Sequence, residues 1–498
     1  MTKNLFLIRT LLLCVLSITG VVGKLNAQTA PAIEWQTSLG GSGEDRPSAI
    51  QQTTDGGYIV VGYTNSDNGD VTGNSDGHPG AWIVKLNGTG NISWQKFRDS
   101  FYVSSVQQTT DGGYIVAGDT GAVTPMGSGM VIKLDNSGNI QWEKSIGGTT
   151  GVDVPQAIQQ TVDGGYIVGG YTTSYDGDAT GKHGGSDTRS DYWVVKLNSA
   201  GEVQWHKCYG GSGDEYAYSI QQTVDGGYVI AGRTDTNNDG DVSGMHGVAD
   251  YWVIKIDGTG NIQWLKCLGG SAGEEAYSIQ QTSDGGYMVA GYTASTDGDV
   301  TNNHGITNYW VVKLDNTGNI QWQKCYGGSV YDYAFGVQQT NDGGYVIVGQ
   351  GNSNDGDETG KPSYNSDCWV VKINALGNIM WQKSLGGTEA DYAYVGNTIQ
   401  QTTDGGFIIA ATSDSDDGDI TGHHGYSLNN DFWIVKLAGD GALPLNYINF
   451  SGKLIDNNVQ LSWQTAQEQN TNYFTVEKSA DAVGAFQIVA KEIVNLGN

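Results

Sequence analysis

The chain has 498 residues and a formal net charge of −28, with 53 acidic against 25 basic residues. A surface this negative repels phosphate backbones, so the composition argues against nucleic acid as a partner. With 76 glycines, 27 tyrosines, 14 tryptophans and only 16% charged residues, it indicates short strands and tight turns, not helices or a disordered chain.

Residues 1–27 read as a secretory signal peptide. Lys3 and Arg9 flank its start, an apolar run extends from Leu11 to Val22, and Ala27 offers a small residue for cleavage. A run of about a dozen apolar residues is short for a membrane span. We therefore expect a protein that is secreted or displayed on the outer cell surface, with no transmembrane segment in the mature chain.

One segment, "SIQQTSDGGYMVAGYT" at 278–293, is present in seven copies with small changes. The aspartates of the DGG motif are Asp55, Asp111, Asp163, Asp225, Asp284, Asp342 and Asp404. Their mean spacing of about 58 residues is typical of a repeat architecture.

Each repeat contains four short strands. In the fifth copy they are AYSIQQT, YMVAGYT, YWVVKL and IQWQKC, and the DGG turn between the first two indicates a tight hairpin. Four-stranded units repeated around a ring are the blades of a β-propeller. The sequence thus predicts an all-β fold, with a seven-bladed propeller over residues 33–438.

The ends of the array predict how the ring closes. The first recognisable strand, in 33–41, matches the fourth strand of a repeat, and the final strand, Asp431–Leu437, matches the third. We expect the N-terminal strand to complete the seventh blade. The alternative is an open solenoid, which requires capping repeats that the sequence does not show.

Tryptophan, lysine and cysteine also recur in register. Large rings at one strand position of every blade are expected to pack between blades, with sugar stacking as the alternative. One tryptophan series is Trp35, Trp94, Trp142, Trp205, Trp264, Trp322 and Trp381, and the other is Trp82, Trp193, Trp252, Trp310, Trp369 and Trp433. Cys208, Cys267 and Cys325 share a position that other repeats fill mainly with serine, which indicates a small semi-buried site and not a disulfide framework.

The long loop between the second and third strands carries an acidic signature, such as "TDGDVT", in six of the seven repeats. Oxygen ligands at alternate positions around a glycine suit Ca²⁺, although Asp, Asn and Gly also favour turns for their own sake. The residues predicted to hold calcium are Asp67, Asp70, Asp176, Asp178, Asp235, Asn237, Asp239, Asp241, Asp297, Asp299, Asp355, Asp357, Asp414, Asp416 and Asp419. The fourth loop resembles the first half of an EF-hand loop but has His246 where a bidentate glutamate is needed.

Enzyme motifs are scarce. The sequence "GGSAG" at 269–273 matches a nucleophile pattern but is the turn between blades, and the carboxylates mostly follow the repeat. Histidines near the loop ends, such as His183 and His304, are as typical of turns as of a transition-metal site. No catalytic residue is predicted.

Residues 443–498 leave the repeat and predict strands near 446–454, 459–465, 472–478 and 485–493. Four strands are too few for a complete β-sandwich, so we expect a partial domain.

The stretch "LPLNYINFSGKLIDNNVQLSWQTAQEQNTNYFTVEKSADAVGAFQIV" resembles the fibronectin type III-like module that precedes a type IX secretion sorting domain in secreted proteins of Bacteroidetes. The "DGGYIVAGYT" and "DYWVVKL" repeats resemble propeller-like arrays of those surface proteins and, more distantly, the quinoprotein-type repeat. The resemblance implies export to the cell surface or the medium, although no sorting domain follows Asn498.

Taken together, the sequence favours a monomeric binding or adhesion protein that presents acidic, calcium-binding loops to an extracellular polysaccharide or surface protein. A polysaccharide-degrading enzyme of the glycoside hydrolase kind and a purely architectural spacer are the alternatives, because fold alone does not decide function.

Overall fold

The computed structural model describes residues 29–439, apart from 122–126, 185–187, 362–364, 395–396 and 426–428, together with the backbone of four strands between 446 and 493. Residues 30–439 form one compact unit. The predicted signal peptide at 1–27 lies outside the described residues.

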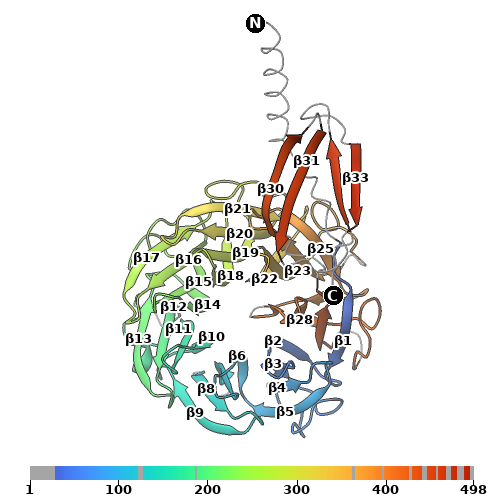
Figure 1. Cartoon of the computed structure of the whole chain (residues 1–498). Helices are drawn as coiled ribbons and strands as arrows, with labels where there is room; N and C mark the ends of the chain where they lie inside the picture. The colour runs from blue at the N-terminus through green and yellow to red at the C-terminus, as the bar shows by residue number, and fades with distance from the viewer. Residues whose placement is uncertain are drawn as a thin grey trace. The chain divides into compact units, whose positions relative to one another are not determined.

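The compact unit is a seven-bladed β-propeller of antiparallel sheets, in which the first strand of each blade borders a central channel and the fourth lies at the rim (Figure 1). Blade 1 comprises β2 (Asp45–Gln52), β3 (Tyr58–Thr64), β4 (Gly80–Leu86) and β5 (Ile92–Asp99). Blade 2 comprises β6 (Tyr102–Gln108), β7 (Tyr114–Asp119), β8 (Gly129–Leu134) and β9 (Ile140–Ile146). Blade 3 comprises β10 (Asp153–Gln160), β11 (Tyr166–Thr172), β12 (Asp191–Leu197) and β13 (Val203–Tyr209). Blade 4 comprises β14 (Glu215–Gln222), β15 (Tyr228–Thr234), β16 (Asp250–Ile256) and β17 (Ile262–Leu268). Blade 5 comprises β18 (Glu274–Gln281), β19 (Tyr287–Thr293), β20 (Asn308–Leu314) and β21 (Ile320–Tyr326). Blade 6 comprises β22 (Asp332–Gln339), β23 (Tyr345–Gly351), β24 (Asp367–Ile373) and β25 (Ile379–Leu385).

The seventh blade joins the two ends of the repeat array. It contains β26 (Asp391–Tyr392), β27 (Ile399–Gln401), β28 (Phe407–Ser413), β29 (Asp431–Leu437) and the N-terminal strand β1 (Ile33–Leu39). Strand β1 pairs antiparallel with β29, with Thr37 opposite Ile434. The predicted closure of the ring is therefore confirmed, and the open solenoid is excluded.

Two consecutive glutamines at the end of each first strand join neighbouring blades. The side-chain oxygen of the first glutamine accepts the backbone N–H of the second glutamine in the next blade. Gln51 accepts in this way from Gln108 at 2.6 Å, and Gln400 closes the circle by accepting from Gln52 at 2.6 Å. The other five bonds are donated by Gln160, Gln222, Gln281, Gln339 and Gln401 to Gln107, Gln159, Gln221, Gln280 and Gln338.

The second glutamines form a parallel ring of bonds. Gln108 accepts the backbone N–H of Thr54 in the preceding blade at 2.8 Å, and Gln52 accepts that of Thr403 at 2.9 Å. The same bond recurs in each of the remaining five blades. The repeated "QQT" therefore holds the inner strands together where no sheet ladder connects them.

The DGG turn is fixed by a buried lysine. In every blade the lysine of the third strand reaches the DGG aspartate, at distances of 2.7 to 3.0 Å. Lys85, for example, is 5% exposed and also donates to its neighbour Leu86 O at 2.8 Å. Partial burial acts to raise the pKa of Asp55, but hydrogen bonds from Thr53, the Gly57 amide and Lys85 lower it to about 2.

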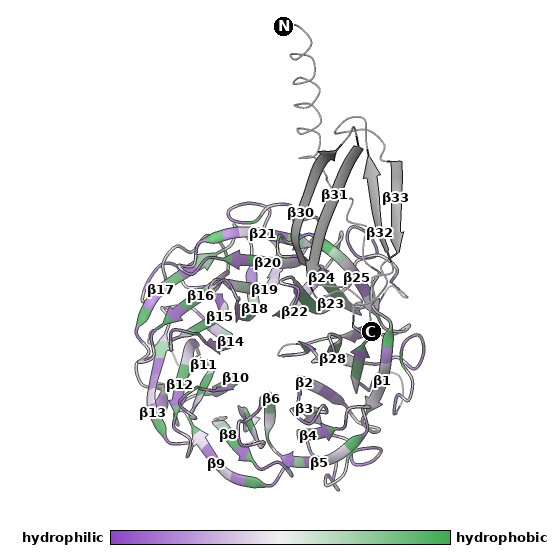
Figure 2. Ribbon diagram, in the orientation of Figure 1, coloured by the Kyte–Doolittle hydropathy of each residue, from purple (hydrophilic) through white to green (hydrophobic). Residues whose placement is uncertain are grey.

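Tryptophans fill the space between blades, as predicted. The third-strand series is fully buried, and Trp252 lies against Tyr192 of the preceding blade with ring centroids 4.6 Å apart. The fourth-strand series is mostly half-buried, and hydrophilic and hydrophobic residues alternate along these outer strands (Figure 2). Trp35 lies against Gly90 of the next blade, where a Cβ atom would come within 2.7 Å of the indole; Gly90 has φ +83°. Burial of the third-strand series excludes sugar stacking by those rings.

The position shared by Cys208, Cys267 and Cys325 is buried, since each cysteine is between 6% and 8% exposed, which confirms a small site within the blades.

Beyond the propeller, β30 (Asn446–Ile455) pairs with β31 (Asn458–Ala466), and β32 (Tyr473–Lys478) pairs with β33 (Gln487–Ile493). The four predicted strands are present as two separate hairpins, and their assembly into a sandwich stays a prediction. Among the described residues, no helix has the length and apolar character needed to cross a membrane.

We predict that Trp252→Ala destabilises the propeller by about 3–5 kcal/mol, because it leaves a cavity between blades 3 and 4. Trp142→Ala, at a half-buried rim position, is the matched control and should cost less. Urea denaturation followed by tryptophan fluorescence measures both. Equal losses would contradict the assignment of the third-strand ring as the main filler between blades.

Candidate functional site

The two ends of the channel differ in what they present. The loop end carries the long acidic loops and the turns between blades, because second strands end there and first strands begin there. The hairpin end carries the DGG turns.

The predicted calcium residues lie at the loop end, where they bind the turn that connects one blade to the next. The first aspartate of each DGD accepts a backbone N–H from this turn; Asp297 accepts from Ser271 at 2.7 Å. The second aspartate of each DGD accepts the backbone N–H of the first glycine of this turn, as Asp299 does from Gly269 at 3.2 Å. Equivalent bonds are made by Asp176, Asp239, Asp355 and Asp417 in the first position and by Asp70, Asp178, Asp241, Asp357 and Asp419 in the second.

The remaining predicted ligands are scattered around these loops. Asp67 accepts from Asn68, Asn237 accepts from Asn238, and Asp235 accepts the Asp214 N–H at 2.6 Å. Asp414 is half-buried and Asp416 is exposed. Within the described part of the chain, no three His, Cys, Asp or Glu side chains are grouped so as to hold a metal ion. Calcium binding therefore stays a prediction, and the geometry assigns these loops a role in docking one blade against the next.

Histidines and buried acids occur together beside the same turns. His424 Nδ1 lies 2.9 Å from Asp431 Oδ2, and Asp431 and Asp45 are both fully buried on either side of Gly40. Burial raises the pKa of Asp431 to about 6, against the opposing effect of His424. His183 and His246 make the same contact with Asp191 and Asp250. These histidines are thus partners of buried carboxylates at blade interfaces.

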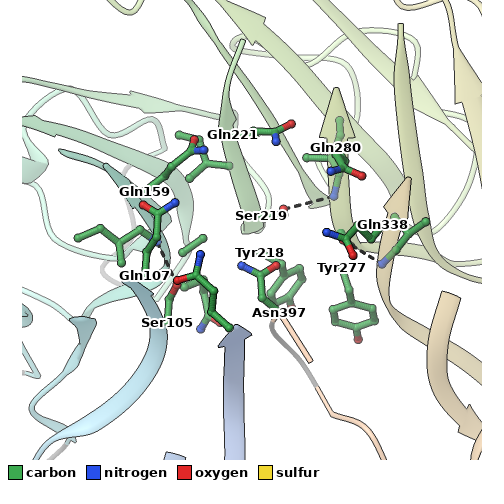
Figure 3. Close-up of a pocket in the computed structure, with 18 of the residues that line it drawn as sticks. Ser105, Gln107, Gln159, Tyr218, Ser219, Gln221, Tyr277, Gln280, Gln338 and Asn397 are labelled. Atoms are coloured by element: carbon green, nitrogen blue, oxygen red, sulfur yellow. Dashed lines mark hydrogen bonds between the residues drawn. The ribbon is translucent and has the colours of Figure 1, made fainter. Parts of the chain in front are cut away.

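Four aromatic rings form an arc across blades 4 to 7, in which Phe335 is buried and Tyr394 is exposed. At one position of the inner strands, blades 4 to 6 carry Tyr218, Tyr277 and Phe335, and Tyr394 of blade 7 follows β26 outside the strand. The ring centroids lie 4.9, 4.9 and 5.5 Å apart in succession. Blades 1 to 3 have the small or polar residues Ser48, Ser104 and Gln156 at this position. Tyr218 and Tyr277 border a cavity of about 230 Å³ in the channel, on one side of the glutamine ring (Figure 3). The repeat is therefore broken beside this cavity.

A polar network supports this aromatic arc. Glu275 is 8% exposed and accepts hydrogen bonds from Tyr218 Oη at 2.5 Å and Tyr292 Oη at 3.0 Å. Arg233 stacks over Tyr216 at 5.3 Å and bonds Asp235 at 3.3 Å. Burial raises the pKa of Tyr218 well above its usual range, and the Glu275 carboxylate adds to this effect. The tyrosines are thus held as neutral donors, with their rings fixed in orientation.

Sequence reasoning missed this site. In blades 4 to 6 the aromatic position falls three residues before the first glutamine of the "QQT" motif, so it could have been found by aligning the repeats and asking where they differ. Attention to the acidic loops led instead to residues that follow the repeat.

Comparison with known proteins assigns neither a family nor a function. No family model matches the chain, and the search of curated proteins gave no match. A protein of unknown function from Bacteroides caccae has 14% identity and a TM-score of 0.38, covering 66% of this chain and 93% of its own. The WD40 β-propeller domain of Doa1 has 11% identity and a TM-score of 0.42, covering 81% and 97%. Puromycin hydrolase has 11% identity and a TM-score of 0.40, covering 78% and 53%. No ligand or activity is transferred from them.

One buried carboxyl group departs from the repeat without lining the channel. Glu358 is fully buried where other blades have Val71, Ala179, Val242, Val300 or Ile420. Gly351, which stands where most blades have threonine, leaves the room that the Glu358 carboxylate fills. Burial raises the pKa of Glu358 to about 8, and Asp332 and Asp367 add to the effect while Lys361 and Ser384 oppose it.

Because the pKa of Glu358 is higher in the folded than in the unfolded chain, its protonated form stabilises the fold. The contribution is complete below about 4.5 and is lost as pH rises through about 8. We predict that Glu358→Gln raises the melting temperature at pH above 8 and leaves it nearly unchanged near pH 5. Glu389→Gln, at an exposed position, is the control. A parallel pH profile for wild type and Glu358→Gln would refute the raised pKa.

Proposed function

We propose that this protein is an extracellular binding protein whose ligand-binding site is the aromatic arc at the loop end of the propeller channel, and that the ligand is a polysaccharide. The observation that carries the proposal is the run of adjacent rings from Tyr218 to Tyr394. Its first three rings stand at an inner-strand position that is small or polar in blades 1 to 3. A binding site for one ligand has to break the sevenfold repeat, and this feature does so.

The chemistry of the arc suits sugars. Tyrosine presents a flat apolar face together with a polar tip, and fixed rings contribute contact area at little cost in side-chain entropy. Pockets that combine aromatic walls with a few oriented polar groups are typical of small-ligand and saccharide sites. Here Glu275 orients Tyr218 through a hydrogen bond, and Asn397 lines the same cavity. The secretory signal expected at 1–27 is consistent with an extracellular ligand.

The acidic loops surround the same end of the propeller. They add negative charge around the mouth of the channel, which disfavours anionic polymers at long range and favours neutral chains. We therefore expect neutral polysaccharides to bind more tightly than acidic ones at low ionic strength.

Tyr277→Ala tests the site directly. The variant should lose about tenfold or more in affinity for a neutral oligosaccharide that the wild type binds, because the central ring of the arc is removed. Gln156→Ala is the matched control, since Gln156 holds the equivalent position in blade 3 and also borders the cavity. Calorimetric titration against a panel of neutral plant and algal oligosaccharides gives the affinities. Equal binding by both variants, or no binding by the wild type across the panel, would refute the proposal.

The calcium prediction has its own test. If the DGD loops bind Ca²⁺, titration into chelator-treated protein should show saturable heat and a raised melting temperature, because an ion that binds only the folded state stabilises it. Asp239→Ala, which removes a predicted ligand in the fourth loop, should lower the number of sites, whereas Asp135→Ala in a rim turn should not. The absence of heat and of stabilisation would leave these loops as blade-docking turns only.

A further inference from the structure

The orientation of the seven first glutamines is fixed by the bonds that hold the blades together. Because each side-chain oxygen accepts a backbone N–H from the next blade, the amide nitrogen must point the other way. Among the described residues none of these seven Nε2 groups donates to the protein, and none is a buried atom without a partner. All seven glutamines border the channel cavity. Figure 3 shows five of them, Gln107, Gln159, Gln221, Gln280 and Gln338, with their side-chain amides around this cavity.

The cavity lining is polar, and among the described residues that form it no side chain is charged. Besides the glutamines it contains serines, Asn397 and the two tyrosines of the arc, with isoleucine, valine and alanine side chains between them. The nearest charges in the adjoining hairpins are the DGG aspartates, each paired with a buried lysine. The glutamine ring is thus a circle of fixed N–H donors with neutral surroundings.

We propose that the glutamine ring binds an oxyanion, such as a sulfate or carboxylate group, inside the channel. Neutral N–H donors bind oxyanions elsewhere in proteins, at helix N-termini and in backbone nests, because the donors replace the water of hydration without a compensating cation. A bond from a neutral donor to a charged acceptor contributes more than a neutral pair. A cation or an amine finds no carboxylate among the side chains that line this cavity.

The negative charge of the whole chain opposes this ligand without forbidding it. At about 0.15 M ionic strength the Debye length is about 8 Å, so exposed loop carboxylates farther away than this are largely screened. The ring lies at the ends of the first strands, next to the hairpin end, while the DGD carboxylates lie at the loop end. The ring therefore borders the same cavity as Tyr218 and Tyr277 but lies nearer the hairpin end, farther from the loop carboxylates.

The test uses Gln221→Glu. A carboxylate at this position still accepts the Gln281 N–H, so the contact between blades is kept, while a donor is replaced by a negative oxygen. Gln222→Glu is the matched control: it makes the same change of charge one residue away, its oxygen likewise accepts a backbone N–H from Val162, and it does not line the cavity. Sodium sulfate, glucuronate and glucose are titrated into each full-length protein by calorimetry at about 0.15 M NaCl.

We expect the wild type to bind sulfate or glucuronate, Gln221→Glu to lose about tenfold or more in affinity, and Gln222→Glu to lose much less. Binding of free sulfate would identify the ligand as an independent ion, whereas binding of glucuronate alone would identify an acidic sugar. Either result supports the ring as an oxyanion site. Equal losses of affinity in both variants would show a long-range charge effect and would refute the ring as the site. The absence of oxyanion binding by the wild type would refute it as well. Melting temperatures check folding, with Gln280→Glu as the replacement if Gln221→Glu unfolds. Neutral oligosaccharide binding that survives in Gln221→Glu separates this proposal from the aromatic arc.

Discussion

The structure depends on hydrogen bonds between blades that no β-sheet supplies. Strands within a blade are joined by ladder bonds, but first strands of adjacent blades diverge around the channel and expose an edge. The "QQT" motif covers this edge. The side-chain oxygen of its first glutamine accepts a backbone N–H from the next blade, and that of its second glutamine accepts one from the preceding blade. Gln400 and Gln52 repeat the bond across the junction between the last blade and the first. The closed ring is thus held at the channel as well as at the rim, where β1 pairs with β29.

The remaining repeated residues follow from this closure. Once the blades face each other at a fixed angle, the wedge between them widens outward and has to be filled, which the third-strand tryptophans do near the middle and the fourth-strand tryptophans do at the rim. The buried lysines and DGG aspartates fix the hairpin end, and the DGD aspartates fix the loop end against the turn between blades. Most of the recurring sequence is consequently used by the scaffold, and function has to be sought where the recurrence fails.

The fold could be predicted because its signals are local and repeated. Asp-Gly-Gly turns, four apolar runs per repeat and a displaced N-terminal strand were enough to predict four-stranded blades and ring closure. The pairing of Lys255 with Asp225 was not predicted, although both series were visible, because it depends on the register between the second and third strands. The aspartates of the loops were assigned to calcium from their spacing alone. Spacing does not show whether a carboxylate faces an ion or a backbone N–H, and here Asp297 and Asp299 face N–H groups. The aromatic arc was missed because Tyr218 and Tyr277 meet only across blades, about 59 residues apart.

The most direct test of the account is a crystal structure of the protein soaked with a neutral oligosaccharide. The account predicts density for the saccharide inside the loop end of the channel, with a ring stacked on Tyr218 or Tyr277 and none at the equivalent positions Ser48 and Ser104. Density confined to the outer tryptophans or to the DGD loops, with an empty channel, would contradict it.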